Sequence, residues 1–259
     1  MTNQLLQFDG SSLVETVPTL DTQLAIADSW LVEDGRARSI QAHFDRFTNW
    51  AQLQKPETLP YLNDFFSLVI AAIPLEGRWF PRIELHGEKP ANQSLHLRLR
   101  EAPEQLGSAI LWTYPEPDPR ENPQIKGPDL SIGMQLRRRA NMIGADEAVI
   151  IDSAGYICEG ALSSLVWWRG DVLCAPNDET PWLASITRSD IFSIAEQMGL
   201  TTRVEKVKPA DLVETEVWML SSLQAIRPVS EWLDLGGPLA GPAHVDAFTK
   251  RLRLLSTSL

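Results

Sequence analysis

Hydrophobic and polar positions in the first half of the chain follow strand-like and helix-like periods in turn. Alternation with a period of two predicts strands at 22–32, 37–41, 79–87 and 94–102, with a turn at 33–36 between the first two. Apolar residues spaced three and four apart predict a helix over His43–Gln54, and a second helix over Leu62–Ile73 ends before Pro74. These elements predict an α/β lobe.

The second half of the chain has a more regular pattern. Helical spacing predicts helices over Ile132–Gly144, with Gly144 as C-cap, and over Thr187–Gly199. Apolar segments predict strands at Asp146–Asp152, Tyr156–Glu159, Leu165–Trp168, Thr202–Val207 and Glu216–Leu220, with turns at 153–155 and 169–171. We therefore expect a second α/β lobe.

A proline-rich stretch, PEPDPRENPQIKGP over residues 115–128, separates the two halves. Proline removes a backbone donor and restricts φ, so neither a helix nor a central strand can run through this stretch. We predict an N-terminal lobe over 1–117, an interlobe linker over 118–128 and a C-terminal lobe over 129–259. A long surface loop within one domain is the alternative interpretation.

Composition and charge narrow the class of protein. The 259 residues include 23 Lys and Arg against 34 Asp and Glu, a net charge of −11, which argues against nucleic acid as a partner. No apolar run approaches the roughly 18 residues of a membrane helix, and the first ten residues lack the pattern of a signal peptide. With only two cysteines, no disulfide scaffold is indicated, and we expect a cytoplasmic protein without a membrane partner.

Several common catalytic signatures do not occur in the sequence. The four histidines never fall at close paired spacing, and the cysteines are wrongly spaced for a zinc cluster, so no metal site is predicted. Glycine-rich phosphate loops and the GxSxG turn of serine hydrolases are also missing.

Four polar positions remain as candidates for chemistry. Lys126 lies in the predicted linker, and Glu159 follows a turn and a strand. Ser185 to Arg188 directly precede a predicted helix, whose N-terminus attracts anions, and Ser221-Ser222 follow a strand. Taken alone, each is better explained as a surface lysine, a surface carboxylate, an ordinary helix cap or a polar turn. Their order along the chain makes the functional interpretation the better one.

That order resembles the fold-type IV (class IV) pyridoxal-phosphate enzymes, which include aminotransferases and aminodeoxychorismate lyases. The segment IKGPDLSIGMQLRRRANMIGADEAVIIDSAGYICEGALSS is similar to the family's run from lysine to glutamate. WLASITRSDIFSIAEQMGL looks like its L-P-G-I-T-R helix start, and MLSSLQAIRPV resembles its strand exit. AHFDRF is similar to the H-x-x-R-L motif of its first lobe. The resemblance extends over roughly residues 24–245.

The resemblance implies a role for each matching residue. Lys126 would be the catalytic residue, forming the Schiff base with pyridoxal 5'-phosphate and then moving the Cα proton. Glu159 would bond the pyridine nitrogen, and Leu183 would pack beneath the ring. The phosphate would be bound by Arg46, by the backbone amides of Ile186 and Thr187, and by Ser222.

The resemblance also implies a fold, a partner and a range of activities. The fold would be two-lobed α/β (α+β), with a smaller N-terminal lobe and a larger C-terminal lobe that carries a barrel-like sheet. The substrate would be an amino acid or a molecule like aminodeoxychorismate, and the protein would be a homodimer. Whether the reaction is an amino-group transfer or a lyase reaction stays open.

The chain departs from the family pattern at a few positions. Ser185 stands for a glycine, Ser222 for a threonine, and Ser163-Ser164 for a serine-asparagine pair. Asp129 and Leu130 stand where the family commonly has asparagine and then tyrosine or arginine. Asp129, Leu130 and Ser164 motivate one alternative, a catalytically impaired cofactor-binding or interaction protein of the same fold. A separate alternative is an unrelated two-lobed protein in which the order of the motifs arose by chance.

Overall fold

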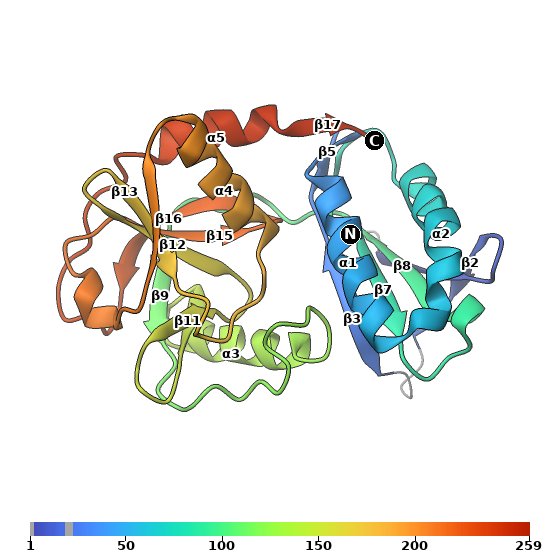
Figure 1. The fold of residues 1–259 in the computed structure, drawn as a ribbon, viewed down its shortest axis with the longest axis horizontal. Coiled ribbons are helices and arrows are strands. Elements are labelled where there is room, and N and C mark those ends of the chain that lie inside the picture. Colours follow the sequence, from blue (N-terminus) through green and yellow to red (C-terminus); the bar gives the residue numbers. More distant parts are fainter. Residues whose placement is uncertain (1–2, 19–22) are drawn as a thin grey trace. The chain divides into compact units, whose positions relative to one another are not determined.

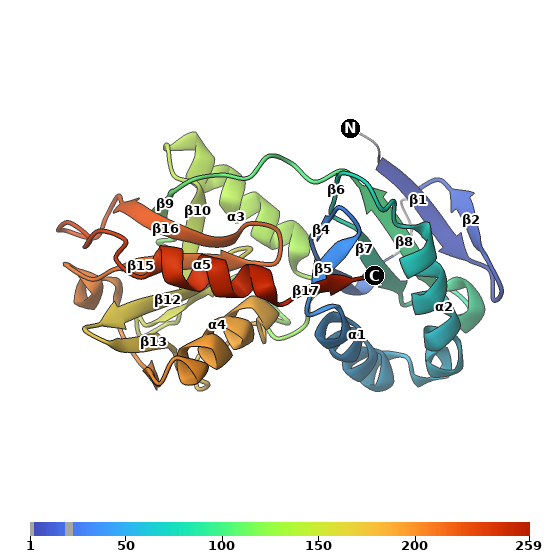
Figure 2. The ribbon, with the colours of Figure 1, turned by 90° about the horizontal axis from the view of Figure 1, so that it is seen from above.

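The computed structural model describes residues 3–18 and 23–259 and divides the chain into two compact units. The first unit comprises Met1–Glu104, Ile125–Pro128 and Leu254–Leu259. The second comprises Gln105–Gln124 and Asp129–Arg253. Figures 1 and 2 show the elements of each unit along the chain.

These boundaries differ from the expected lobes over 1–117 and 129–259 with a linker over 118–128. The strand β9 (Ala109–Thr113) pairs with β10 (Glu147–Ile151) and β16 (Ala225–Trp232), so its apolar side chains belong to the core of the second unit. The proline-rich stretch divides between the units, because its last four residues lie against the first unit and the residues before them belong to the second.

The first unit is built on an antiparallel five-stranded sheet. Its order is β2 (Leu13–Thr16), β1 (Asn3–Phe8), β8 (Leu95–Arg100), β7 (Arg82–His86) and β3 (Leu24–Ser29). A smaller sheet has the order β17 (Ser256–Ser258), β5 (Arg36–Arg38), β4 (Val32–Glu33) and β6 (Arg78–Trp79). Thr22, the first residue of the strand predicted over 22–32, lies outside the described residues.

Alternation along β7 and β8 gives this sheet two different faces. Ile83 on β7 and Leu97 on β8 join one core with phenylalanines of α1 (Ile40–Gln54) and α2 (Leu59–Ala72). The residues that alternate with these apolar positions lie on the opposite face of the sheet. They are Arg82, Glu84 and His86 on β7 and His96 and Arg98 on β8. Two short 3-10 helices, η1 (Pro56–Thr58) and η2 (Ala91–Gln93), complete this unit.

The second unit contains a curled eight-stranded sheet, coloured from green to orange in Figure 1. Its order is β11 (Ile157–Gly160), β10, β9, β16, β15 (Val217–Ser221), β12 (Ser164–Arg169), β13 (Val172–Pro176) and β14 (Thr201–Glu205). The pairs β9–β10, β9–β16 and β13–β14 are parallel and the others antiparallel. The expected α/β (α+β) class with a barrel-like second sheet is confirmed.

Three α-helices pack on this sheet. The helix α3 (Leu130–Met142) contacts β10, and α4 (Ile186–Gln197) contacts β12, β14 and β15. Phe248 of α5 (Val245–Leu254) packs edge-on against Trp168 and Trp218. A 3-10 helix, η3 (Pro209–Leu212), precedes β15.

The periodicity predicted most of these elements, with ends shifted by a few residues, and missed several strands. The strand β16 was missed because Pro228 lies within it. Its pairing with β9 begins at Val229, after the proline, and a register shift follows, so the missing N–H interrupts no bond on that side. The strands β1, β2, β9, β13 and β17 and the helix α5 were also not predicted.

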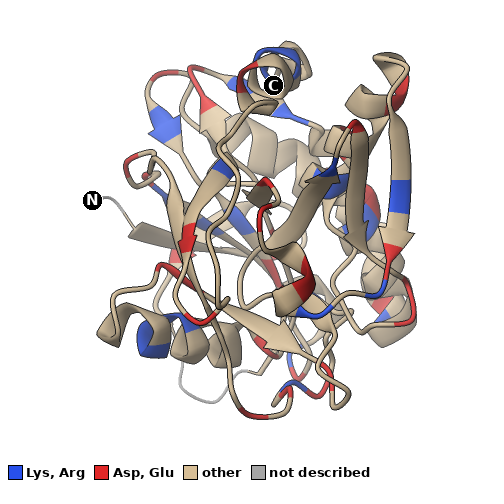
Figure 3. Cartoon of the chain, turned by 90° about the vertical axis from the view of Figure 1, so that its left-hand side faces the viewer, with Lys and Arg blue, Asp and Glu red and all other residues tan. Residues whose placement is uncertain are grey.

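Charge distribution and helix length are two further features of the described residues. On the side drawn in Figure 3, basic and acidic residues are interspersed. Among the described residues, no helix combines the length and apolarity that crossing a membrane requires, and no group of three or more His, Cys, Asp or Glu side chains is placed to hold a metal ion.

Candidate functional site

Glu159 is a buried carboxylate of the second unit that contacts two other segments of the chain. It is on β11, opposite Ile150 of β10, and is only 5% exposed. Its Oε1 atom accepts a hydrogen bond of 2.9 Å from the backbone N–H of Leu183 and is ion-paired with Arg120. A buried carboxylate requires such partners, because burial without them strongly disfavours the charged form.

Arg120 is the main functional candidate that the sequence pattern did not reveal. Its Nε and Nη2 atoms donate to the carboxylate of Asp118, and its Nη1 atom donates to Glu159. Burial alone would lower the pKa of Arg120, but the hydrogen bonds to Asp118 and the charge of Glu159 outweigh burial and raise it. The sequence does contain a signal for this ion pair, because Asp118 and Arg120 carry opposite charges on either side of Pro119. The interpretation of the stretch as a linker assigned no role to them.

Leu183 connects Glu159 to the N-terminus of α4, three residues further along the chain. Ser185 is the N-cap of α4, and its hydroxyl accepts a hydrogen bond from the N–H of Arg188 at 3.2 Å. Ile186 and Thr187 form the first turn and are buried. The structure therefore brings Glu159, Leu183 and this helix start together, and the N–H groups and dipole of a helix N-terminus favour an anion.

Arg188 lies in the same turn and packs against residues that precede α4. Its guanidinium lies 3.8 Å from the ring centroid of Trp182 and donates to the carbonyl of Pro176 at 2.9 Å. Burial lowers the pKa of Arg188 to about 10, which leaves it positively charged at neutral pH. It therefore fixes the segment that enters α4 and adds positive charge near it.

Ser222 lies in the turn between β15 and β16. Ser221 and Ala225 face each other at the base of this turn, and the hydroxyl of Ser221 accepts from the N–H of Gln224 at 3.0 Å. Ala225 has a φ of 55°, which is uncommon for a residue with a side chain. Such backbone strain persists only where the surrounding structure holds it, as β15 and β16 do here.

The end of β11 is held by a close contact between Gly160 and Ser163. A Cβ atom on Gly160 would lie 2.2 Å from the hydroxyl oxygen of Ser163, so a larger residue there would require the Ser163 side chain to move. Ser163 donates to the buried carboxylate of Glu147 at 3.2 Å, and Arg137 is ion-paired with the same carboxylate. Ser163 thus helps to fix the strand that presents Glu159.

Cys158, next to Glu159, is a buried residue that fills the core of the second unit. It is fully buried, and burial together with the charge of Asp118 raises the pKa of its thiol to about 12. A thiol with such a pKa stays protonated at neutral pH and is a poor nucleophile.

Lys126 belongs to a four-residue segment of the first unit, Ile125–Pro128. Its backbone carbonyl accepts a hydrogen bond of 2.6 Å from the N–H of Ala27 on β3. A Cβ atom on Gly127 would lie 2.5 Å from the carbonyl oxygen of Ala25, so the segment can approach β3 only with glycine there. The backbone that carries Lys126 is thereby held against the sheet.

We expect Gly127→Ala to displace this segment. The nearest atoms are backbone atoms of Ala25 and Ile26, which cannot rotate away, so we expect a loss of about 1–3 kcal/mol in the free energy of unfolding. Urea unfolding would measure it, with Gly107→Ala as the matched control, because a Cβ on Gly107 meets no atom within 4 Å. Equal stability of the two variants would contradict this packing.

Arg46 is held by a buried carboxylate in the first unit. Its Nε and Nη2 atoms donate to Asp28 at 2.8 and 2.7 Å, and Nδ1 of His43 lies 2.7 Å from the same carboxylate. Burial alone would raise the pKa of Asp28, but the charge of Arg46 and the hydrogen bond with His43 hold it well below its usual range. The guanidinium of Arg46 is thus fixed in one orientation.

Asp129, where the family commonly has asparagine, closes a loop. Its Oδ2 atom accepts a hydrogen bond of 2.7 Å from the N–H of Asn122, and its carbonyl accepts from the N–H of Gly133 in α3. The residue therefore joins the start of α3 to the segment that precedes Lys126.

Comparison with known proteins agrees with these motifs. A family model described as amino-transferase class IV matches residues 25–232. The branched-chain-amino-acid aminotransferase of Escherichia coli (strain K12) is 30% identical over 125 residues, which are 48% of this chain and 38% of that protein. The matched segments span less than half the length of the first curated relatives.

Solved structures share the fold over nearly the whole chain. A hypothetical aminotransferase from Mycobacterium tuberculosis, in its PLP-bound form, has a TM-score of 0.81 at 19% identity and covers 98% of both chains. A Legionella pneumophila protein, provisionally assigned as a 4-amino-4-deoxychorismate lyase, has a TM-score of 0.78 at 18% identity, covering 93% of this chain and 96% of its own. At such identities these similarities establish the fold.

Proposed function

This chain belongs to the aminotransferase class IV family, and on that premise we propose that it is a pyridoxal-phosphate-dependent enzyme acting on an amino acid. The observation that carries the proposal is the buried carboxylate of Glu159, which is hydrogen-bonded to Leu183 just before the N-terminus of α4. A carboxylate and an anion-binding helix start in one place suit a ligand that carries a basic ring nitrogen and a phosphate.

Glu159 would hold a proton on that ring nitrogen. Its carboxylate accepts hydrogen bonds from Arg120 and from the N–H of Leu183, and this arrangement also suits a hydrogen bond from a protonated nitrogen. Arg120 acts as a positioning residue, because its fork to Asp118 fixes the orientation in which Glu159 is held. When bound, pyridoxal phosphate supplies an aldehyde and a ring that accepts electrons.

Phosphate binding would use the first turn of α4. The backbone N–H groups of Ile186 and Thr187 and the hydroxyl of Ser222 are the donors that the motifs assign to this group. Arg46, held by Asp28, would add a guanidinium whose geometry matches phosphate, and Leu183 would pack beneath the ring. The residues present fit the cofactor in charge and in donor type.

Lys126 would hold the cofactor aldehyde covalently and then carry the substrate's Cα proton. The hydrogen bond from Ala27 to its carbonyl and the tight contact at Gly127 fix its backbone, and its side-chain amine would move the proton. A lysine acts as a base only when its pKa is lowered, which desolvation and neighbouring positive charge achieve. We further propose a homodimer, as the family resemblance implies.

Absorption spectroscopy of the full chain with added pyridoxal phosphate tests the proposal. We expect a visible band that borohydride removes, with the reduced adduct on the Lys126 peptide in mass spectrometry. Amino acids should then convert the band, and aminodeoxychorismate tests the lyase reaction. An adduct on another lysine, such as Lys206 or Lys208, would contradict the assignment, and a Lys126 adduct without conversion by any donor would favour the catalytically impaired alternative.

A further inference from the structure

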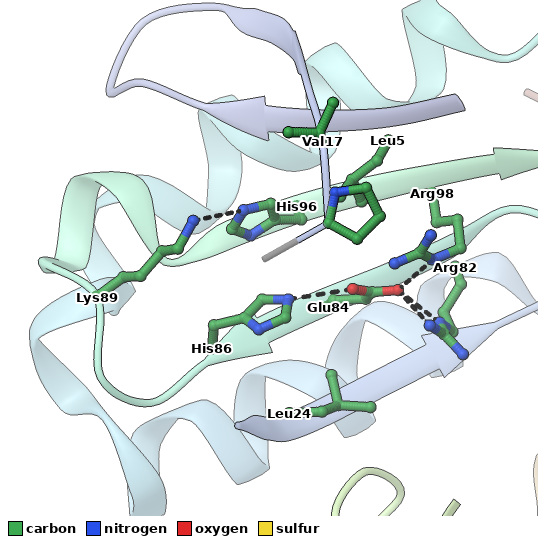
Figure 4. A pocket seen from close by; sticks show the side chains of 10 residues that line it. Leu5, Val17, Leu24, Arg82, Glu84, His86, Lys89, His96 and Arg98 are labelled. Carbon is green, nitrogen blue, oxygen red and sulfur yellow. Dashed lines mark hydrogen bonds and ion pairs between the residues drawn. The ribbon is translucent and has the colours of Figure 1, made fainter. Parts of the chain in front are cut away.

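A pocket of about 170 Å³ lies on the sheet face of the first unit opposite α1 and α2 (Figure 4). Its polar wall is formed by alternate residues of β7 and β8. Because these strands are antiparallel with Arg82 opposite Arg98 and Glu84 opposite His96, their polar side chains converge on one spot. None of these residues is among those proposed to bind the cofactor.

Glu84 organises the pocket from its centre. Its Oε1 atom accepts hydrogen bonds from Nε of Arg82 at 2.7 Å and Nε of Arg98 at 2.8 Å, and its Oε2 atom lies 3.1 Å from Nε2 of His86. Burial alone would raise the pKa of Glu84, but its hydrogen bonds from His86 and Arg98 and the charge of Arg82 hold it well below its usual range. One carboxylate thereby fixes two guanidinium groups side by side.

The pocket carries an excess of positive charge. Arg82, Arg98 and Lys89 line it, and Glu84 is the one acidic side chain among the described lining residues. Lys89 reaches across to His96, with 3.4 Å between Nζ and Nε2. Burial, with smaller effects of His86 and Lys89, lowers the pKa of His96 to about 4, so its ring is neutral at neutral pH.

The histidine wall of the pocket carries a polar atom that could bind a ligand. The Nδ1 atom of His86 is buried and has no hydrogen-bond partner among the described residues. A buried polar atom without a partner is costly, and a bound polar ligand or water is its common explanation. The ring of His86 packs edge-on against that of His96 with 4.5 Å between centroids, so the two imidazoles form one rigid wall.

The rest of the lining is apolar. Leu5, Val17, Pro18 and Leu24 complete the lining (Figure 4). Leu5 lies opposite Arg98 in the pairing of β1 with β8, and Leu24 lies opposite His86 in the pairing of β3 with β7. An inorganic ion would leave this apolar surface uncovered. The combination of two adjacent guanidiniums with an apolar wall suits a ligand with an anionic head and a short apolar chain.

We propose that this pocket binds a small organic carboxylate with a short apolar chain. The carboxylate is accepted between Arg82 and Arg98, with Lys89 adding charge at the rim, and the chain lies against Leu5 and Leu24. The site is formed by the first unit alone, so its occupancy is independent of the proposed cofactor chemistry at Lys126 and Glu159.

Titration with 4-methylpentanoate, followed by NMR of the histidine ring signals in the full chain loaded with pyridoxal phosphate, tests the proposal. We expect saturable shifts of the His86 and His96 signals, with the signal of His244 in the second unit unmoved. Acetate and inorganic phosphate should bind more weakly because neither covers the apolar wall. Equal or tighter binding of inorganic phosphate would overturn the preference for an apolar chain.

Substitutions assign the binding to these side chains. Arg98→Gln should weaken binding about tenfold or more, because a charge-assisted contact is lost. Lys89→Gln leaves the Glu84 network intact and should weaken binding about threefold, which keeps the proposal testable if Arg98→Gln does not fold. The exposed Arg138→Gln is the matched control. Unchanged binding in both pocket variants would overturn the proposal.

A further variant distinguishes this pocket from the proposed cofactor site. Lys126→Ala should bind 4-methylpentanoate as the wild type does, because Lys126 is not part of the pocket. Loss of binding in Lys126→Ala, with no shift of the His86 and His96 signals, would assign the carboxylate to the cofactor site and overturn the proposal. Failure of the cofactor test would leave the histidine shifts as expected.

Discussion

We expect Lys126→Ala to lower turnover by at least about 10²- to 10⁴-fold, because the group proposed to move the Cα proton is removed together with the covalent anchor of the cofactor. The fold should be retained, since the carbonyl that accepts from Ala27 belongs to the backbone and is unchanged. Single-turnover absorption measurements with an amino donor would quantify the loss.

The exposed Lys250 of α5 provides the matched control for this prediction. Lys250→Ala removes an equal charge and should leave turnover unchanged. A Lys126→Ala variant that keeps wild-type turnover would show that Lys126 has no catalytic role, and the proposed function would lose its central residue.

Asp28→Ala should have the largest effect on stability, about 3–5 kcal/mol in the free energy of unfolding. Asp28 is fully buried, and its removal would leave Arg46 and His43 without the carboxylate that both now contact. Hydrogen exchange of β3 and α1 would measure the loss locally. The exposed Asp45→Ala on α1 is the control, and equal protection in both variants would contradict the prediction.

Buried titratable groups of the first unit predict how its stability depends on pH. The pKa values of Asp28 and Glu84 are lowered in the folded chain, so their contribution is present above about pH 4 and is lost as the pH falls further. Burial lowers the pKa of His43, so below about pH 6.5 the unfolded chain gains a proton that the folded chain does not bind.

Both effects have the same sign and should lower the urea midpoint between pH 7 and pH 3. The decline should be shallower in Asp28→Ala, because the variant has already lost the carboxylate that the acid titrates. Parallel profiles of wild type and variant would show that Asp28 does not contribute in this way.

Glu159 and Arg120 connect the fold to the proposed chemistry. Glu159 is presented by β11, whose end is held by the contact between Gly160 and Ser163, and Arg120 reaches it from a segment 39 residues away in the chain. The carboxylate of Glu159 is therefore positioned by a residue from the proline-rich stretch. That stretch serves the site as well as connecting the two units.

The sequence by itself determined the main elements and the family. The periods of apolar residues that predicted α1, α2, α3 and α4 are local properties of the chain, because a helix or strand buries one face wherever it packs. The motif order from Lys126 to Ser222 led to the same family that the model over residues 25–232 matches. Gly127 and Gly160, which the motifs contain, are explained by close contacts.

Only the tertiary structure decided which groups meet. Three contacts join residues that are distant in the sequence. They are the ion pair of Arg120 with Glu159, the ion pair of Arg46 with Asp28, and the contact of Arg98 with Glu84. The assignment of β9 to the second unit likewise depends on its partners β10 and β16. Coulombic attraction and strand pairing depend on distances in space, which no periodicity along the chain encodes.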